Sequence, residues 1–437
     1  MKLDRLFFGL CIFLTVLSTW MLGCEPGTIT HHCDSPYTCP LPEPRPAEES
    51  PQTPDLTATD EPTGSALIPA PAVGDEPGNS IATPTPSGCT PGEVEDWGEG
   101  GDSQIAAGPQ GFAVGWDADV TRLQMVDRTG KPTSASLVVP TGASAGWPQL
   151  AYGRSGYLVS TEWPTNLMTY GQNGTLRSSV LGVYYGGGNF RVAGGETDRA
   201  MWLVFDQNSS YETWISQVVV ATISDDGQAV GPRAIGVYAN GGQTQTRSFN
   251  GFAAKGSSVA VGMWVDAFNG VGSDYHELNV LVDTGTYGST KIVNLSSCLG
   301  QCYHFVHRIV ATDSGFAVLW RRTTWSPSPM ETHVLSFIGE DGTFRGSVAV
   351  DPAHDVAWSG SEFGLVYYNE ALRTVTFRTL APDGQALTES KTLWVGSVYW
   401  SSYPKLAASG RTFGVVWVSD GYPVNQTNLK FTTVSCQ

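Results

Sequence analysis

One sequence pattern recurs seven times between residues 105 and 417. Each copy has an apolar residue, often followed by alanine, then a short glycine-containing turn, and then alternating small and large residues that usually end on an aromatic. The copies begin at Ile105, Leu150, Val192, Phe252, Ile309, Val356 and Leu406. Their starts lie 42 to 60 residues apart, which is enough for four short strands and their turns. The repeat therefore predicts a β-propeller.

The composition of one copy explains why such units must pack together. In Phe112–Trp116 the large residues fall on one face of a strand and the small residues on the other, because successive side chains of a strand alternate. A second turn with glycine follows most copies, for example at Asp127–Gly130 and Glu340–Gly342. Two hairpins per repeat make a four-stranded blade, and one blade alone cannot bury both of its faces.

The predicted fold class is therefore all-β: a β-propeller of seven four-stranded blades, with six or eight blades as alternatives. The seventh unit ends at Gln437, which leaves no room for its fourth strand. A strand near Glu93–Trp97, before the first repeat, is the candidate to complete that blade. We expect the two ends of the chain to close the ring together.

The cysteines fit this closure. Outside the leader and Cys24, six cysteines permit fifteen connectivities. The grouping we predict is Cys89–Cys436, which bracket the repeats, with the local pairs Cys33–Cys39 and Cys298–Cys302. A bond across so long a loop contributes on the order of 4–5 kcal/mol in the chain-entropy account. Free thiols are the alternative for any of these pairs.

The N-terminus points to a compartment. Met1–Arg5 is a short charged segment, residues 6–17 are apolar, and Met21–Cys24 places a small residue before a cysteine. These residues resemble a bacterial lipoprotein signal. The resemblance implies a signal peptide over 1–23, a lipid anchor on Cys24 and, from Glu25, a place at the outer membrane of the cell envelope. An ordinary secretory leader is the alternative.

Residues 24–88 are predicted to be a disordered tether with a small Cys33–Cys39 loop, followed by the propeller domain over 89–437. Thirteen of the 27 prolines lie between Pro40 and Pro91, mixed with Thr, Ala, Ser and Glu and without apolar periodicity. Such a composition cannot bury enough apolar surface to offset the entropy of ordering. Proline-rich segments are extended and semi-rigid, so this one suits a spacer.

The net charge of −17 lies mostly in the tether. Residues 101–437 carry 21 Lys and Arg against 26 Asp and Glu, without a basic cluster or stripe. Nucleic acid is therefore not an expected partner. No cofactor motif is present, and we expect a monomer.

One dense polar segment, Cys298–Arg308, precedes the fifth repeat. Its spacing of Cys298, Cys302, His304 and His307 is too compressed for a zinc finger, and a strand places His304 and His307 on opposite faces. We interpret it as a disulfide-closed loop with two surface histidines that are candidate ligand-binding residues, and no metal site is predicted.

Two further groups are candidate ligand-binding residues. Asp266 and Asp274 flank a glycine-rich loop that lacks the inner oxygen ligands calcium requires, so a plain connection or a ligand loop is expected. Four tryptophans in or near connections either stack on sugars or cap blade edges: Trp325, Trp358, Trp394 and Trp400. Trp116, Trp264, Trp320 and Trp417 close repeats and are expected in the core.

Two function classes remain open. The chain resembles bacterial lipoproteins with tandem propeller-like repeats, and this resemblance implies no particular chemistry. By analogy with other propellers, the first class is a non-catalytic, membrane-anchored module that binds a protein, peptide or glycan. The alternative is a polysaccharide-acting enzyme, a glycoside hydrolase or lyase, although no nucleophile motif is present and catalytic residues are not predicted. Two carboxylates facing each other across the axis would favour a hydrolase.

Overall fold

The computed structural model describes most of the repeat region, and the account below is limited to those residues. They are 88–140, 148–161, 166–180, 190–206, 214–237, 244–268, 274–285, 289–300, 302–325, 329–399, 402–421 and 426–437. Within these ranges the chain is all-β. Among the described residues, no helix has the length and apolar character that a membrane span requires.

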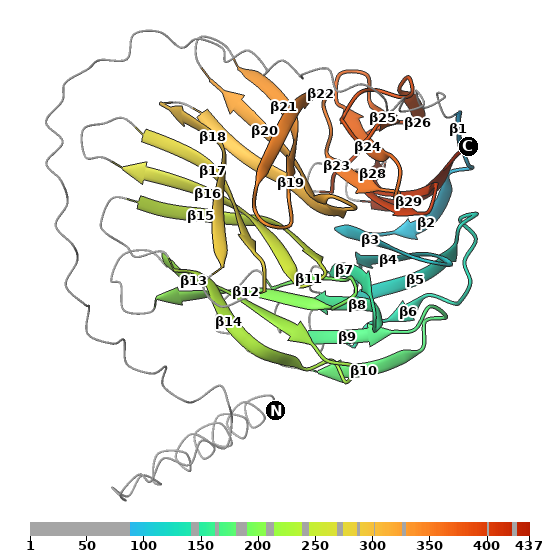
Figure 1. The fold of residues 1–437 in the computed structure, drawn as a ribbon. Coiled ribbons are helices and arrows are strands. Elements are labelled where there is room, and N and C mark those ends of the chain that lie inside the picture. Colours follow the sequence, from blue (N-terminus) through green and yellow to red (C-terminus); the bar gives the residue numbers. More distant parts are fainter. Residues whose placement is uncertain are drawn as a thin grey trace, which may run out of the picture. The chain divides into compact units, whose positions relative to one another are not determined.

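The strands form seven antiparallel sheets, one for each repeat (Figure 1). Blade 1 contains β3 (Ser103–Gly108), β4 (Gly111–Asp117), β5 (Thr121–Asp127) and β6 (Leu137–Val138). Blade 2 contains β7 (Pro148–Gly153), β8 (Gly156–Thr161), β9 (Asn166–Tyr170) and β10 (Leu176–Val180). Blade 3 contains β11 (Arg191–Ala193), β12 (Arg199–Asp206), β13 (Trp214–Ile223) and β14 (Ala229–Val237).

The remaining blades follow the same order. Blade 4 contains β15 (Thr244–Lys255), β16 (Ser258–Phe268), β17 (Asp274–Asp283) and β18 (Thr290–Leu299). Blade 5 contains β19 (Cys302–Thr312), β20 (Gly315–Thr324), β21 (Met330–Ile338) and β22 (Phe344–Val350). Blade 6 contains β23 (Asp355–Trp358), β24 (Phe363–Asn369), β25 (Thr374–Leu380) and β26 (Lys391–Val395). Blade 7 contains β27 (Lys405–Ser409), β28 (Thr412–Gly421) and β29 (Gln426–Cys436).

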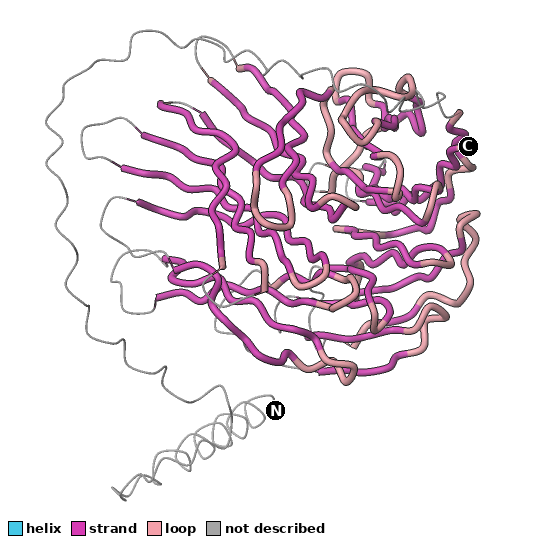
Figure 2. Tube along the Cα trace, in the orientation of Figure 1, coloured by secondary structure: helices cyan, strands magenta, loops and turns pink. Residues whose placement is uncertain are grey.

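The first strand of every blade faces a common axis. These inner strands contact one another in succession, from β3 through β7, β11, β15, β19 and β23 to β27, and β27 contacts β3 again. The blades therefore close into a ring, in which the sheets are arranged around a common axis (Figure 2). The sequence prediction of a seven-bladed propeller with four-stranded blades is confirmed.

Each sequence repeat is the first hairpin of its blade. In blade 1, β3 pairs with β4 around the glycine-containing turn of the repeat. The second predicted turn of each unit, such as the one at Gly130 or Gly342, has its glycine at positive φ, where a side chain would be strained. One period of the sequence repeat therefore corresponds to one blade.

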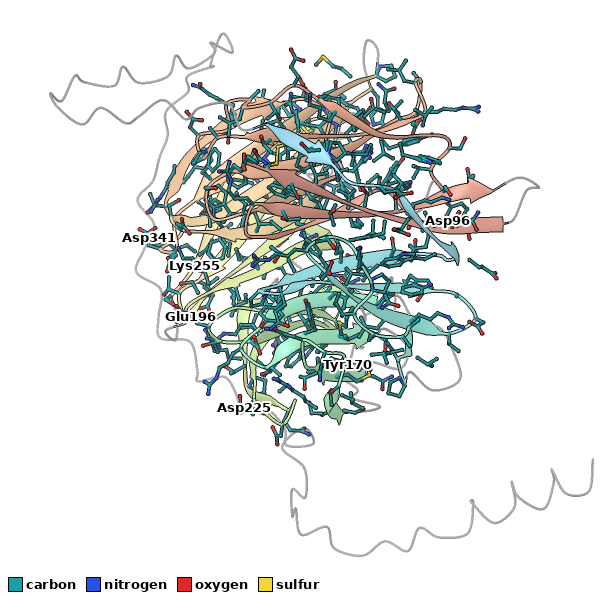
Figure 3. The ribbon with its side chains drawn as sticks, turned by 90° about the vertical axis from the view of Figure 1, so that its right-hand side faces the viewer. Asp96, Tyr170, Glu196, Asp225, Lys255 and Asp341 are labelled. Carbon is teal, nitrogen blue, oxygen red and sulfur yellow. A yellow bond between two sulfur atoms is a disulfide. The ribbon has the colours of Figure 1, made fainter. Side chains whose placement is uncertain are left out.

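The N-terminal segment completes blade 7, as expected. Two short strands pair with β29: β1 (Cys89–Pro91) and β2 (Glu95–Glu99). Cys89 lies opposite Cys436 in the register, with 4.1 Å between their Cα atoms, and a disulfide joins them. Lys430 also forms an ion pair with Asp96, labelled in Figure 3. Both ends of the repeat region are thus fixed to one sheet.

The hydrophobic core is divided among the gaps between blades. The aromatic residue after each repeat turn is fully buried in four copies, at Phe112, Phe316, Phe363 and Phe413. The small residue after it gives room to the next blade: a Cβ atom on Gly364 would lie 2.6 Å from the Phe413 ring, and one on Gly414 would lie 3.0 Å from Phe112. The alternation of large and small residues is therefore an inter-blade packing code.

Candidate functional site

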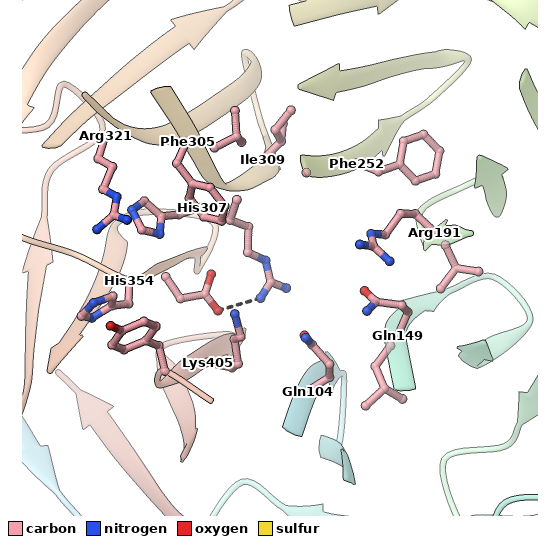
Figure 4. Close-up of a pocket in the computed structure, with 17 residues that line it drawn as sticks. Gln104, Gln149, Arg191, Phe252, Phe305, His307, Ile309, Arg321, His354 and Lys405 are labelled. Carbon is pink, nitrogen blue, oxygen red and sulfur yellow. Dashed lines mark hydrogen bonds and ion pairs between the residues drawn. The ribbon is translucent and has the colours of Figure 1, made fainter. Parts of the chain in front are cut away.

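The residues immediately before each repeat form a ring around the axis, here called the axial ring. They line a cavity of about 350 Å³, the axial pocket. The ring consists of Gln104, Gln149, Arg191, Gly251, Arg308, Asp355 and Lys405, one from each blade in order. Figure 4 shows Gln104, Gln149, Arg191 and Lys405 gathered around an open centre. Because every inner strand runs in the same direction, equivalent positions meet at one level of the axis.

The axial pocket is positively charged. Arg191, Arg308 and Lys405 of the axial ring, together with Arg321 from β20, face one lining carboxylate, Asp355. This excess of positive charge sits in a domain with more acidic than basic residues over 101–437. A concave site lined by one sign of charge concentrates ions of the opposite sign.

Both carboxylate oxygens of Asp355 accept hydrogen bonds. Its Oδ2 atom accepts hydrogen bonds from Nη1 of Arg308 at 2.9 Å and from the backbone N–H of Leu406 at 2.7 Å. Its Oδ1 atom accepts from the backbone N–H of Val356 at 2.9 Å. With 1 % of its surface exposed, this carboxylate balances Arg308 and links blades 5, 6 and 7.

Lys405 is left with its charge uncompensated by a direct partner. No hydrogen bond or ion pair of its ammonium group is formed within the described part of the chain. Burial lowers the pKa of Lys405, and the nearby charges of Arg308 and Arg191 lower it further, whereas Asp355 and Asp102 oppose the shift. An anion placed in the axial pocket would therefore stabilise the charged form of Lys405.

Blade 4 contributes a glycine to the axial ring, and therefore no side chain. Gly251 has a φ of +84°, and a Cβ atom there would lie 2.8 Å from Cγ1 of Ile309. The register of β15 and β16 shifts between Phe249 and Phe252, so the chain bulges at this point. The pocket is consequently bounded on this side by Phe252 instead of a polar ring residue.

Histidines line the wall next to blade 6. The imidazole of His307 lies 5.5 Å from that of His333 and 6.0 Å from that of His354, measured between ring centroids. Burial is the largest cause that lowers all three pKa values, to about 3 for His354. Nδ1 of His354 accepts from the N–H of Tyr368 at 3.0 Å, and its ring stacks on Tyr403 at 4.1 Å. These groups are neutral at physiological pH.

The axial pocket is one part of a central channel, which continues past the axial ring into a second cavity. The second cavity, of about 270 Å³, shares Leu150, Val192, Phe252, Arg308 and Ile309 with the first, so the two are adjacent. Most of its other lining residues are alanine, including Ala106, Ala107, Ala254 and Ala408. One half of the channel is therefore charged, and the other is lined by small side chains and strand backbone.

The prediction of surface histidines is wrong for His304, and the two histidines, both in β19, lie in different environments. His307 lines the axial pocket, whereas His304 is fully buried against blade 4, with Nε2 3.0 Å from Oγ of Ser296. Burial lowers the pKa of His304 to about 4. Cys298 and Cys302 are joined by a disulfide that links β18 to β19. The opposite orientation of the two histidines follows from strand alternation, as the sequence indicated.

Of the predicted tryptophans, Trp358 lines the second cavity beside the axial pocket, whereas Trp325 and Trp394 line neither cavity. Trp358 packs against Phe363 at 4.6 Å between centroids, and Trp394 packs against Trp417 at 5.9 Å. Both lie beside inter-blade clusters, which corresponds to the structural alternative considered for them. Trp325 directly follows β20 and is 55 % exposed. Trp116, Trp320 and Trp417 are buried core residues, as expected, whereas Trp264, also expected in the core, is only half-buried.

Several predicted positions lie outside what the structure describes. Asp266 belongs to β16, opposite His276, and Asp274 begins β17 opposite Phe268, but their side chains and the loop 269–273 are not described. Trp400, Cys24, Cys33 and Cys39 also lie outside the described residues. The predictions for these residues therefore stay predictions.

The described lining does not contain the carboxylate pair of a glycoside hydrolase. Asp355 is its single carboxylate, and it is already paired with Arg308. Burial and the charge of Asp102 raise the pKa of Asp117 to about 7, but these two residues belong to blade 1 and do not face each other across the axis. Within the described ranges, no group of three or more His, Cys, Asp or Glu side chains is arranged to hold a metal ion.

Sequence reasoning missed most of the axial pocket. The usable signal was the position just before each repeat, which is polar or charged in every copy except the fourth. An apolar inner strand that begins with Gln, Arg, Asp or Lys places that polar group at the edge of the core. The repeat alignment therefore contained the axial ring, one residue outside the segment that defined it.

Comparisons with known proteins give distant structural similarities and no family. No family model and no curated protein matches the chain. Among solved structures, the polysaccharide lyase Uly1 is 9 % identical, with a TM-score of 0.47 over 82 % of this chain and 91 % of that one. Hydrazine synthase of Kuenenia stuttgartiensis is 13 % identical, with a TM-score of 0.43 over 82 % and 98 % of the two chains. A sialidase of Trypanosoma rangeli is 9 % identical, with a TM-score of 0.37 over 77 % and 54 %.

Proposed function

We propose that the propeller is a binding module that takes an anionic group of its ligand in the axial pocket. The observation that carries the proposal is the charge of the lining, in which Arg191, Arg308, Arg321 and Lys405 outnumber the one lining carboxylate, Asp355. Arg308 is paired with Asp355, and Arg321 is paired with Glu331 outside the lining. Cationic groups in a concave site attract an anion and fix its orientation. Lys405 is the central contact, because its ammonium group has no direct partner in the described part of the chain.

The polar groups around these cations suit a carboxylate on a larger molecule. Gln104 and Gln149 bring amides that both donate and accept hydrogen bonds. Arg191 presents a planar guanidinium, which pairs with two oxygens of one carboxylate. The pocket volume of about 350 Å³ lies at the lower end of the usual range for ligand sites. One acidic unit of a ligand is therefore the expected occupant.

The proposal places this module at the bacterial cell envelope. Met21–Cys24 support lipidation of Cys24, and the proline-rich composition of residues 40–91 supports a spacer between the anchor and the propeller. Metabolic labelling with a fatty-acid precursor tests the anchor. Label in the wild-type protein and none in a Cys24→Ala variant is expected, whereas equal labelling of both would contradict it.

Binding is tested first with small probes. Galacturonate and galactose share a sugar ring and differ in the carboxylate, so ligand-observed NMR with both isolates the contribution of charge. We expect galacturonate to bind the propeller at low salt, galactose to bind at least about tenfold more weakly, and added salt to weaken galacturonate binding. Equal signals from both sugars would overturn the anion proposal.

The same samples test the enzymatic alternative. Incubation of the propeller with polygalacturonate, followed by size-exclusion chromatography, detects any cleavage of the polymer. An unchanged size distribution agrees with a non-catalytic module. Shortened chains that appear with wild-type protein but not with a Lys405→Met variant would contradict the non-catalytic part of the proposal.

A further inference from the structure

Blades 4 and 5 extend beyond the axial ring on the side of the pocket. Six residues of β19, Cys302 to His307, precede its ring residue Arg308, and β15 likewise begins seven residues before Gly251. The inner strands β11, β23 and β27 begin at their ring residues instead. The pocket therefore has a raised wall on one side, built from blades 4 and 5.

Aromatic side chains follow this wall from the pocket outward. Phe305 lines the axial pocket, and its ring lies 6.4 Å from that of Tyr303 at an interplanar angle of 21°. Tyr303 meets Trp264 of β16 edge to face at 4.6 Å. All three side chains are half-buried. We call Phe305, Tyr303 and Trp264 the aromatic row.

The aromatic row has charged and unsatisfied polar groups beside it. The guanidinium of Arg321 lies 5.8 Å from the centre of the Phe305 ring and also lines the pocket. Nε1 of Trp264 is buried and has no hydrogen-bond acceptor among the described residues. A buried N–H without an acceptor is costly, so the packing of Trp264 against Tyr303 is maintained at some cost in polar contacts.

We propose that the ligand is an acidic oligosaccharide or polysaccharide, with one uronate in the axial pocket and the following sugar units along the aromatic row. This inference rests on the proposed function and adds the class of ligand to it. Aromatic rings offer flat apolar faces to the C–H faces of sugar rings, while their polar edges contact hydroxyl groups. The amides of Gln104 and Gln149 serve the hydroxyl groups of the unit in the pocket.

An acidic peptide is the competing polymer, and the described residues favour it less. Peptides bind by strand addition, in apolar side-chain pockets or, for acidic motifs, on clusters of arginine. The axial pocket shares arginines with the last mode, but it adds two amides and an aromatic row on one wall, which suit the hydroxyl groups and C–H faces of sugars. The test below includes a peptide so that the two polymers are distinguished.

Chain length is the variable that tests the aromatic row. Affinities of the propeller for galacturonate, tetragalacturonate, cellotetraose and hexaglutamate are measured by calorimetry or competition NMR. We expect tetragalacturonate to bind about tenfold or more tightly than galacturonate, and cellotetraose and hexaglutamate to bind more weakly than tetragalacturonate.

Substitutions in the row should remove the gain that comes with chain length. Tyr303→Ala and the milder Tyr303→Leu are expected to lower tetragalacturonate affinity about fivefold to tenfold and to leave galacturonate affinity unchanged. The matched control is Phe344→Ala, an aromatic side chain that is 48 % exposed on the outer strand β22 of the same blade. This control should change neither affinity.

The possible outcomes separate the two proposals. Galacturonate binding without any gain for the tetramer, or a gain that survives both Tyr303 substitutions, overturns the aromatic row. Hexaglutamate that binds as tightly as tetragalacturonate overturns the assignment to a glycan. Absence of binding by every acidic probe overturns the proposed function itself.

Discussion

Nη1 of Arg308 lies 2.9 Å from Oδ2 of Asp355, and the same carboxylate oxygen accepts the backbone N–H of Leu406. The one carboxylate of the axial ring, Asp355, therefore forms a contact between blades. Arg308 is held in place by this pair, whereas the ammonium group of Lys405 has no direct partner in the described part of the chain and lines the axial pocket. Neighbouring members of the axial ring therefore have different roles: Asp355 and Arg308 hold blades together, and Lys405 is available to bind a ligand.

Substitution of Asp355 by Asn separates these two roles. Loss of the carboxylate leaves Arg308 without its counter-charge, and we expect the free energy of unfolding to fall by about 2–3 kcal/mol. The estimate is at the lower end for a buried pair, because 28 % of the Arg308 side chain is exposed. Since the pocket gains one net positive charge, galacturonate affinity should rise. Denaturant unfolding and NMR titration measure the two effects, and a fall in affinity would show that Asp355 itself contacts the ligand.

The two disulfides should differ in their contribution to stability. The Cys89–Cys436 bond closes a loop of 347 residues, whereas Cys298–Cys302 spans four. In the chain-entropy account, loss of the long bridge costs about 4 kcal/mol more than loss of the short one. Double Cys→Ser variants of each pair, compared by thermal unfolding, test this order. A larger destabilisation from the short pair would contradict ring closure as the main effect.

Acid should destabilise the propeller through His304. Its folded-state pKa of about 4 lies below the ordinary value of 6.5, so the unfolded chain binds the proton more readily. The stability that neutral His304 contributes is complete above about pH 6.5 and is lost as pH falls toward 4, by an amount on the order of 3 kcal/mol. A His304→Gln variant should show a shallower decline over this range. An identical pH profile for both proteins would remove this explanation.

Adding even a methyl group to a small residue of the repeat should destabilise the propeller. A Cβ atom on Gly414 would lie 2.8 Å from Cδ1 of Ile105 and 3.0 Å from the Phe112 ring, in the gap between blades 7 and 1. We expect Gly414→Ala to lower the free energy of unfolding by about 1–3 kcal/mol through overpacking. Gly88→Ala, with no atom within 4 Å of its Cβ position, serves as the control. Equal stability of the two variants would contradict the packing code.

The fold could be predicted because its determinants are local and repeated. Phe112, Phe316, Phe363 and Phe413 occupy the same place in their blades, and Cys89 and Cys436 bracket the repeats. The candidate site was harder to predict from the sequence, because it joins residues far apart in the chain, such as Gln104 and Lys405. His307 was recognised as a candidate, but its contact with His354 depends on how blades 5 and 6 pack. The bulge at Gly251 breaks the repeat spacing and leaves no clear signal.

The role of the axial ring is tested most directly by the affinity of galacturonate for wild-type and Lys405→Met propellers. Methionine keeps much of the lysine's length and removes its charge, and thermal unfolding confirms that both proteins are folded. The account predicts that the substitution weakens galacturonate binding about tenfold or more and reduces its dependence on salt. Equal affinity and equal salt dependence in the two proteins would contradict an anion site in the axial pocket.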